Sequence, residues 1–230
     1  MTARVDSLLE DIDHLVDDGE LDAALAAATR LLAGRLSRAD KIQALMARAS
    51  IHDDLEDHER ALADCDAALA LAPRSPDVLY LRATIHQSTE NWRASKSDLD
   101  AAIAIEPHAD LHELRGLARY NLGDLRGARD DFAVAIAEKP DIESRFHTYR
   151  GMAALLLDEP KAAIEDFTNA LAQNETDAKA LAQRAKAYEV VGNPKAALAD
   201  LDRLARLLPE NPALTAERAR VKKLASSRRG

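Results

Sequence analysis

The chain has 230 residues, of which 47% are hydrophobic and 3% aromatic, and it contains one cysteine. This length allows one large domain or two small ones with a buried core. The composition excludes collagen-like chains, disordered chains and aromatic-rich β-sandwiches. A single cysteine excludes an intramolecular disulfide and a cysteine-based zinc site. The net charge of -9 argues against nucleic acids and anionic membranes as partners, because it repels phosphate groups.

Alanine, leucine, arginine and glutamate are abundant, and because these residues favour helices, the composition predicts an all-α fold. Residues 1–20 are acidic from Asp6 onward and lack the basic start and apolar run of a secretion signal. No stretch approaches the roughly 18 apolar residues of a membrane span. We therefore expect a cytoplasmic protein, and the high alanine and arginine content favours a bacterial source.

Prolines mark an internal repeat. Pro73, Pro107, Pro140 and Pro209 are separated by 34, 33 and 69 residues, and Glu175 stands where a further proline is expected. With this proline as position 32 of a unit, position 8 is occupied by Ile12, Ala49, Ala83, Gly116, Gly151 and Ala185. Small residues at positions 8, 20 and 27 let the two helices of a unit, and the first helix of the next, pack closely. The pattern predicts helix pairs that stack on one another.

In chain order, we expect a degenerate first helix pair over residues 5–38 and an extra stretch over Ser37–Lys41. Further pairs are expected over 42–75, 76–108, 109–142, 144–177 and 178–211, followed by a capping helix and basic tail over 212–230. Asp57, Asn91, Asp124 and Asn193 each precede a second helix and are expected to be N-caps. We interpret the basic end as a helix cap; the alternative is a contact site for an acidic partner.

Two turn segments carry a family resemblance. Leu122–Leu125, followed by Ala128 and Phe132, and Val191–Pro194, followed by Ala197 and Leu201, resemble the inter-helix turn and second helix of the tetratricopeptide repeat (TPR) family. The resemblance covers nearly the whole chain. It implies a single domain over residues 1–230, folded as a right-handed superhelical solenoid of helix-turn-helix repeats whose first helices line a concave groove.

Opposite charges recur at two fixed positions. Position 7 is Arg48, Arg82, Arg115, Arg150 and Arg184, and position 23 of the same units is Asp64, Asp98, Asp131, Asp166 and Asp200. An arginine inside a helix interface needs a partner, because an unpaired buried charge is strongly destabilising. We therefore predict structural Arg–Asp pairs and a lower melting temperature for Asp131→Ala. The alternative is an arginine ladder for polyanions.

The sequence offers no catalytic constellation. Cys65 occupies a core position, so we expect a buried thiol rather than a nucleophile. His108 and His112 have helical metal-ligand spacing but lack an expected third ligand, so no metal and no cofactor are predicted. We expect a protein that is not an enzyme; the alternative is an enzyme with an unfamiliar site.

The family resemblance places a binding groove at positions 2, 5, 9 and 12 of the first helices. The candidate peptide-binding residues are Met46, Ser50, Asp53, Tyr80, Thr84, Gln87, Glu113, Leu117, Tyr120, Arg145, Thr148, Met152, Leu155, Lys179 and Lys186. The early residues are polar or acidic, the middle ones include tyrosine and methionine, and the late ones are basic. The alternative is that individual members only pack against neighbouring first helices. The basic clamp with which some family members hold a carboxylate is absent.

We therefore expect a protein-interaction adaptor that binds an extended or helical segment of a partner protein in this groove. Lys179 and Lys186 favour a segment that is acidic at one end. The alternative function is homo-oligomerisation through the groove and the terminal repeats.

Overall fold

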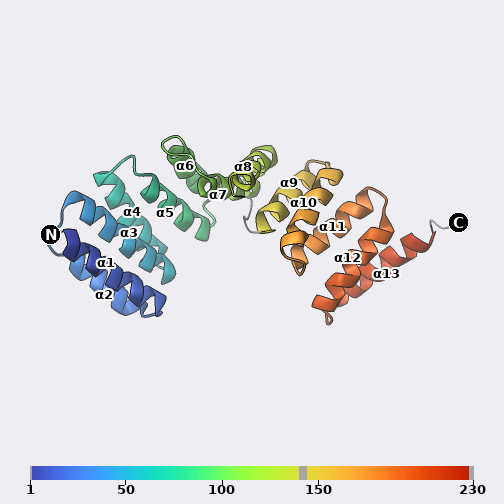
Figure 1. The fold of residues 1–230 in the computed structure, drawn as a ribbon, viewed down its shortest axis with the longest axis horizontal. Coiled ribbons are helices and arrows are strands. Elements are labelled where there is room, and N and C mark those ends of the chain that lie inside the picture. The colour runs from blue at the N-terminus through green and yellow to red at the C-terminus, as the bar shows by residue number, and fades with distance from the viewer. Residues whose placement is uncertain (1, 140–143, 228–230) are drawn as a thin grey trace. The chain divides into compact units, whose positions relative to one another are not determined.

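The structure, a computed structural model, describes residues 2–139 and 144–227, and the elements within these ranges are thirteen α-helices without a strand (Figure 1). Pro140 and the basic tail residues Arg228 and Arg229 lie outside the described residues. The chain divides into two compact units, Met1–Ala118 and Arg119–Gly230, with the boundary inside α7 (Ala109–Asn121). Each unit is described by itself.

Unit 1 consists of three helix hairpins followed by the start of α7. The hairpins are α1 (Thr2–Asp17) with α2 (Leu21–Leu32), α3 (Arg38–Asp54) with α4 (His58–Leu71), and α5 (Pro76–Ser88) with α6 (Trp92–Ile103). The extra residues predicted before the second repeat lengthen α3, which begins one residue after its N-cap Ser37. The insertion therefore adds helix rather than a longer loop.

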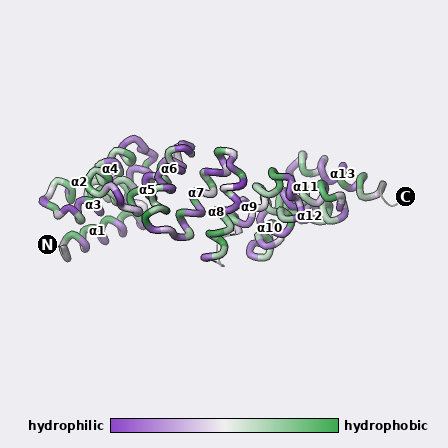
Figure 2. The backbone as a smooth tube through the Cα atoms, turned by 90° about the horizontal axis from the view of Figure 1, so that it is seen from above, coloured by the Kyte–Doolittle hydropathy of each residue, from purple (hydrophilic) through white to green (hydrophobic). Residues whose placement is uncertain are grey.

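Unit 2 contains the end of α7 and six further helices. These are α8 (Leu125–Glu138), α9 (Ser144–Leu156), α10 (Pro160–Gln173), α11 (Ala178–Val190), α12 (Pro194–Leu207) and α13 (Pro212–Ser227). Hydrophobic and hydrophilic residues are interspersed along the helices of both units (Figure 2), as expected for helices that bury one face.

The turns between the two helices of a hairpin share one geometry. Asp57, Asn91, Asp124 and Asn193 accept a hydrogen bond from the backbone N–H three residues later, so all four predicted N-caps are confirmed. The residue immediately before each of these caps has a positive φ: 59° at Glu56, 55° at Glu90, 81° at Gly123 and 75° at Gly192. The repeated turn thus tolerates a left-handed residue that is not always glycine.

Small residues bring the paired helices together. Ala49, Ala83 and Ala185 at position 8 are at most 1% exposed. At the equivalent Gly151 an added Cβ would lie 2.8 Å from Cε1 of Phe167 on α10. A side chain at Gly151 would therefore force α9 and α10 apart.

Buried ion pairs join the two helices of four repeats. The shortest N–O distances are 2.6 Å for Arg48–Asp64, 2.6 Å for Arg82–Asp98, 2.5 Å for Arg150–Asp166 and 2.7 Å for Arg184–Asp200. These four aspartates are 3–6% exposed. The predicted structural pairing is confirmed in these repeats.

In the remaining repeat, Arg115 contacts Asp100 at 2.9 Å, and the 2%-exposed Asp131 accepts a hydrogen bond from Arg119 at 2.7 Å. The carboxylate at position 23 is therefore buried and bound by an arginine here too.

Two of these arginines also contact the preceding repeat, at repeat position 25, which lies in its second helix. Arg82 contacts Asp66 at 2.6 Å, and Arg184 donates to the hydroxyl of Thr168 at 3.0 Å. The position-7 side chain therefore marks the face of each first helix that meets the helix before it.

Cys65 lies in the core of unit 1, where it packs with Ala61 and Ala68 of α4 and Ile85 of α5. Its side chain is fully buried. Burial raises the pKa of the Cys65 thiol to about 12, so the thiolate is scarce at neutral pH. The predicted buried thiol is confirmed.

Two aspartates on α12 give a matched test of the buried pairs. Asp200 is 3% exposed and binds Arg184, whereas the side chains of Asp202 and its partner Arg218 are 40% and 39% exposed. Asp200→Ala leaves a buried arginine without its carboxylate and should cost about 3 kcal/mol of unfolding free energy. Asp202→Ala should cost less than about 1 kcal/mol. Chemical denaturation followed by circular dichroism measures the free energy of unfolding of both variants. Equal decreases would contradict the prediction that the buried pair contributes more to stability than the exposed pair.

The raised pKa of Cys65 predicts a protected thiol. A chromogenic disulfide reagent at pH 8 should react with the native chain at least tenfold more slowly than with the chain in guanidinium chloride, which serves as the control. Equal rates in the two states would show that the thiol is accessible in the native fold.

Candidate functional site

The first helices of unit 1 form a cavity of about 540 Å³ on one face of the unit. Its lining residues are Leu9 and Asp13 of α1, Gln43, Met46, Ala47 and Ser50 of α3, and Asp77, Tyr80 and Leu81 of α5. The α3 residues are spaced by three and four positions and so share one helix face. Three helices from successive repeats thus contribute to one concave surface.

Three predicted groove residues, Met46, Ser50 and Tyr80, lie together in this cavity. Tyr80 is 37% exposed, and Met46 is half-buried against the core formed by α3, α4 and α5. Asp13 and Asp77 are the charged members of the lining. The cavity therefore combines an aromatic ring and a thioether with two carboxylates, a surface suited to an apolar side chain beside a cation.

The other predicted residues of unit 1 make contacts within the protein or are half-buried. Asp53 pairs with His58 at 2.8 Å, and Thr84 donates to the carbonyl of Leu81 at 2.7 Å. Gln87 donates to the hydroxyl of Ser95 at 3.1 Å and to the carbonyl of Leu114 at 2.9 Å. Glu113 and Leu117 are half-buried on α7.

In unit 2, several predicted groove residues are packed rather than open. Thr148 is 2% exposed and donates to Asp177 at 3.0 Å. Tyr120 lies edge-on to Tyr149, with ring centroids 5.7 Å apart. Met152 and Leu155 pack, half-buried, against the core around Phe167. For these residues the structure supports the packing interpretation.

The basic residues of unit 2 are exposed. Arg145, Lys179 and Lys186 lie on the surfaces of α9 and α11. The Arg145 guanidinium is 4.6 Å from the ring centroid of Phe146, and the Lys179 ammonium is 4.6 Å from that of Tyr149. The aromatic rings thus hold two of the three cations in defined positions.

Sequence reasoning missed the contribution of the first repeat. Leu9 and Asp13 occupy positions 5 and 9 of the degenerate unit, which are groove positions by the same numbering that selected Met46 and Ser50. Applying the pattern to the first repeat would have found both residues.

Within the described residues, no group of three or more His, Cys, Asp or Glu side chains is arranged to hold a metal ion. His108, considered above as a ligand, lies 3.8 Å from the carboxylate of Asp110 and is 45% exposed. Each helix in the described part of the chain is too short or too polar to cross a membrane.

Sequence models of the tetratricopeptide repeat match residues 9–76 and residues 49–114. No curated protein sequence matches the chain. Among solved structures, PilW, described as a widely conserved type IV pilus biogenesis factor, is similar over 92% of this chain and 97% of its own, with a TM-score of 0.78 and 17% identity.

YrrB, described as a TPR protein with an unusual peptide-binding site, is similar over 76% of this chain and 91% of its own, with a TM-score of 0.69 and 19% identity. MamA from Desulfovibrio magneticus RS-1 matches 75% of this chain and 96% of its own, with a TM-score of 0.65 and 19% identity. These similarities confirm the predicted all-α solenoid of helix-turn-helix repeats. The matches show tetratricopeptide repeats across residues 9–114.

Proposed function

We propose that the chain is a non-enzymatic interaction scaffold that binds a peptide segment of a partner protein in the cavity between α1, α3 and α5. TPR proteins are generally protein-interaction scaffolds, and one structural relative is described as having a peptide-binding site. The observation that carries the proposal is the cavity itself, because Met46, Ser50 and Tyr80 were selected from the sequence and line it together.

The chemistry of the lining indicates the kind of segment. Tyr80 and Met46 offer a large contact area to an apolar side chain. Asp13 and Asp77 favour a lysine or arginine beside it. The helices that carry these residues are preformed, so binding orders the peptide and not the scaffold.

The first helices of unit 2 favour a different kind of residue on the partner protein. The exposed cations Arg145, Lys179 and Lys186 favour acidic residues of a bound protein on the first helices of that unit. The proposed partner therefore carries an acidic stretch in addition to the apolar and basic residues that fit the cavity of unit 1.

A peptide selection tests the cavity. Peptides selected from a random display library on the folded chain should be rich in basic and apolar residues. Tyr80→Ala should weaken their binding, measured by fluorescence anisotropy, by roughly tenfold or more, because it removes a central aromatic contact.

Leu55→Ala is the matched control, because Leu55 and Tyr80 are both 37% exposed and Leu55 lies in the turn after α3. It should leave the affinity unchanged. Selected peptides that bind Tyr80→Ala as tightly as the wild type would refute this site. If the bound segment is instead a second copy of the chain, Tyr80→Ala will lower the mass of the assembly in solution.

A further inference from the structure

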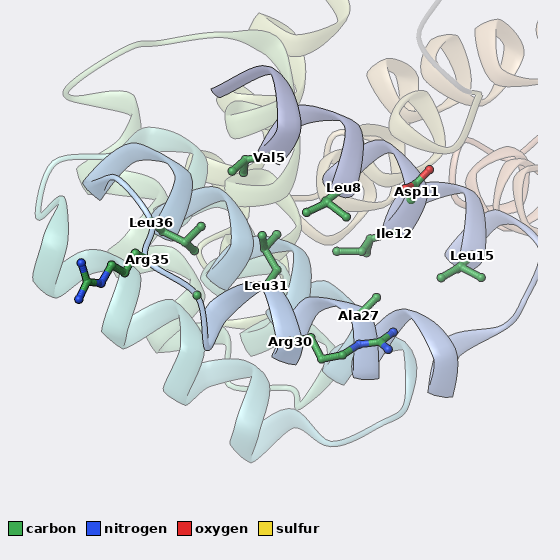
Figure 3. A pocket seen from close by; sticks show the side chains of 11 residues that line it. Val5, Leu8, Asp11, Ile12, Leu15, Ala27, Arg30, Leu31, Arg35 and Leu36 are labelled. Atoms are coloured by element: carbon green, nitrogen blue, oxygen red, sulfur yellow. The ribbon is translucent and has the colours of Figure 1, made fainter. Parts of the chain in front are cut away.

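A second cavity, of about 680 Å³, opens between α1 and α2 of unit 1 (Figure 3). It shares no lining residue with the cavity between α1, α3 and α5. Its lining is mostly apolar, but three charged side chains belong to it: Asp11 of α1, Arg30 of α2 and Arg35 of the segment after α2. We call the surface formed by Leu8, Asp11, Arg30, Leu31 and Arg35 the end face.

The leucine at the middle of the end face is uncovered. Leu8 stands at position 4 of its repeat and is 40% exposed, whereas Leu45 and Leu79 at the same position of the next two repeats are at most 5% exposed. Those two leucines belong to core clusters that include a leucine of the preceding second helix, Leu32 and Leu69 respectively. Within unit 1, the described helices that pack on α1 are α2 and α3, which follow it. Repeat arrays normally present a polar surface at their ends, so an apolar end face indicates an interface.

The charges of the end face have both signs. Asp11, Arg30 and Arg35 are exposed, and among the described residues none of the three forms an ion pair or a side-chain hydrogen bond. A uniformly acidic or uniformly basic surface would therefore meet at least one like charge here. A surface that itself carries a carboxylate and arginines around apolar residues is complementary. The end face of a second copy of this chain is such a surface.

The placement of the charges fits a two-fold contact. In Figure 3, Leu8 and Leu31 lie in the middle, with Asp11 on one side of them and Arg35 on the other, while Arg30 lies beside Ala27, off the line between these two charges. When two identical faces meet about a two-fold axis that passes between Asp11 and Arg35, each of these residues meets the other one of the second copy.

The same arrangement supplies the type of helix that first helices receive elsewhere in the chain. A second helix packs on the first helix of the next repeat where α2 meets α3, α4 meets α5, α10 meets α11 and α12 meets α13. Because Arg35 directly follows the end of α2, a contact between Arg35 and Asp11 brings the second helix α2 of one copy onto the first helix α1 of the other.

We propose that the end faces of two copies of this chain bind each other about a two-fold axis and form a dimer. Leu8 of both copies lies at the centre, and Asp11 of each copy pairs with Arg35 of the other. Both copies use the same surface, so the assembly closes at two chains. The contact goes beyond the proposed peptide binding, because it leaves the cavity between α1, α3 and α5 open in both copies and so gives the dimer two peptide sites.

Sedimentation velocity of the full chain tests the contact. The wild type should change from monomer to dimer as its concentration rises and should reach no larger mass. Leu8→Glu should weaken dimerisation at least tenfold, because it places a charge at the apolar centre. Leu122→Glu, at a leucine that is 38% exposed in the turn after α7, is the matched control and should dimerise as the wild type does.

Charge reversal tests the two-fold pairing. Asp11→Arg and Arg35→Asp should each weaken dimerisation at least tenfold, because two pairs of like charges then meet. An equimolar mixture of these two variants should dimerise again, since an arginine then faces an aspartate in both pairs. Asp17→Arg changes an exposed carboxylate of α1 outside the cavity and is the control for added charge.

Three results would overturn the proposal: a wild type that is monomeric at every concentration, a wild type that grows beyond a dimer, and a variant mixture that stays monomeric. Dimerisation that Tyr80→Ala removes and Arg35→Asp leaves intact would overturn it too and assign the assembly to the cavity between α1, α3 and α5. Arg35→Asp should bind the selected peptides as the wild type does, so peptide binding and dimerisation are tested separately.

Discussion

The buried arginine–aspartate pair is the contact on which the repeat architecture depends. In a repeat such as 76–108, Arg82 binds Asp98 on the second helix and Asp66 on the helix before it, so one guanidinium ties three helices together. Burial raises the pKa of the Asp166 carboxyl although Arg150 is bound to it, which indicates a substantial desolvation cost. We interpret these pairs as setting which helix faces meet, while the alanine-rich contacts supply the favourable packing.

The first repeat lacks this pair, and there the surface changes while the helix hairpin is kept. Asp11 and Ala27 replace the arginine and aspartate of the later repeats, and α1 and α2 still form a hairpin with a buried core around Ile12. What changes is the chemistry of the cavity between α1 and α2, whose lining carries Asp11, Arg30 and Arg35 among apolar side chains.

The candidate groove was predictable in part. The repeat positions that selected Met46, Ser50 and Tyr80 placed these residues correctly in one cavity. They did so because the neighbouring side chains come from equivalent positions of the adjacent first helices. The same period failed for Thr148 and Tyr120, because their burial depends on Asp177 and Tyr149, which the repeat pattern does not place. Position within a repeat predicts the direction of a side chain, but not what lies in front of it.

The amino-acid sequence by itself determined the helical repeats, their turns with N-caps at Asp57, Asn91, Asp124 and Asn193, and the presence of position-7 and position-23 charges. Each of these depends on residues close together in the chain or on a strict period. Only the tertiary structure decided that Arg119 donates to the carboxylate of Asp131, that Thr148 is buried beside Asp177, and that Tyr120 packs on Tyr149. These features depend on distances between side chains of different helices, and local periodicity does not specify those distances.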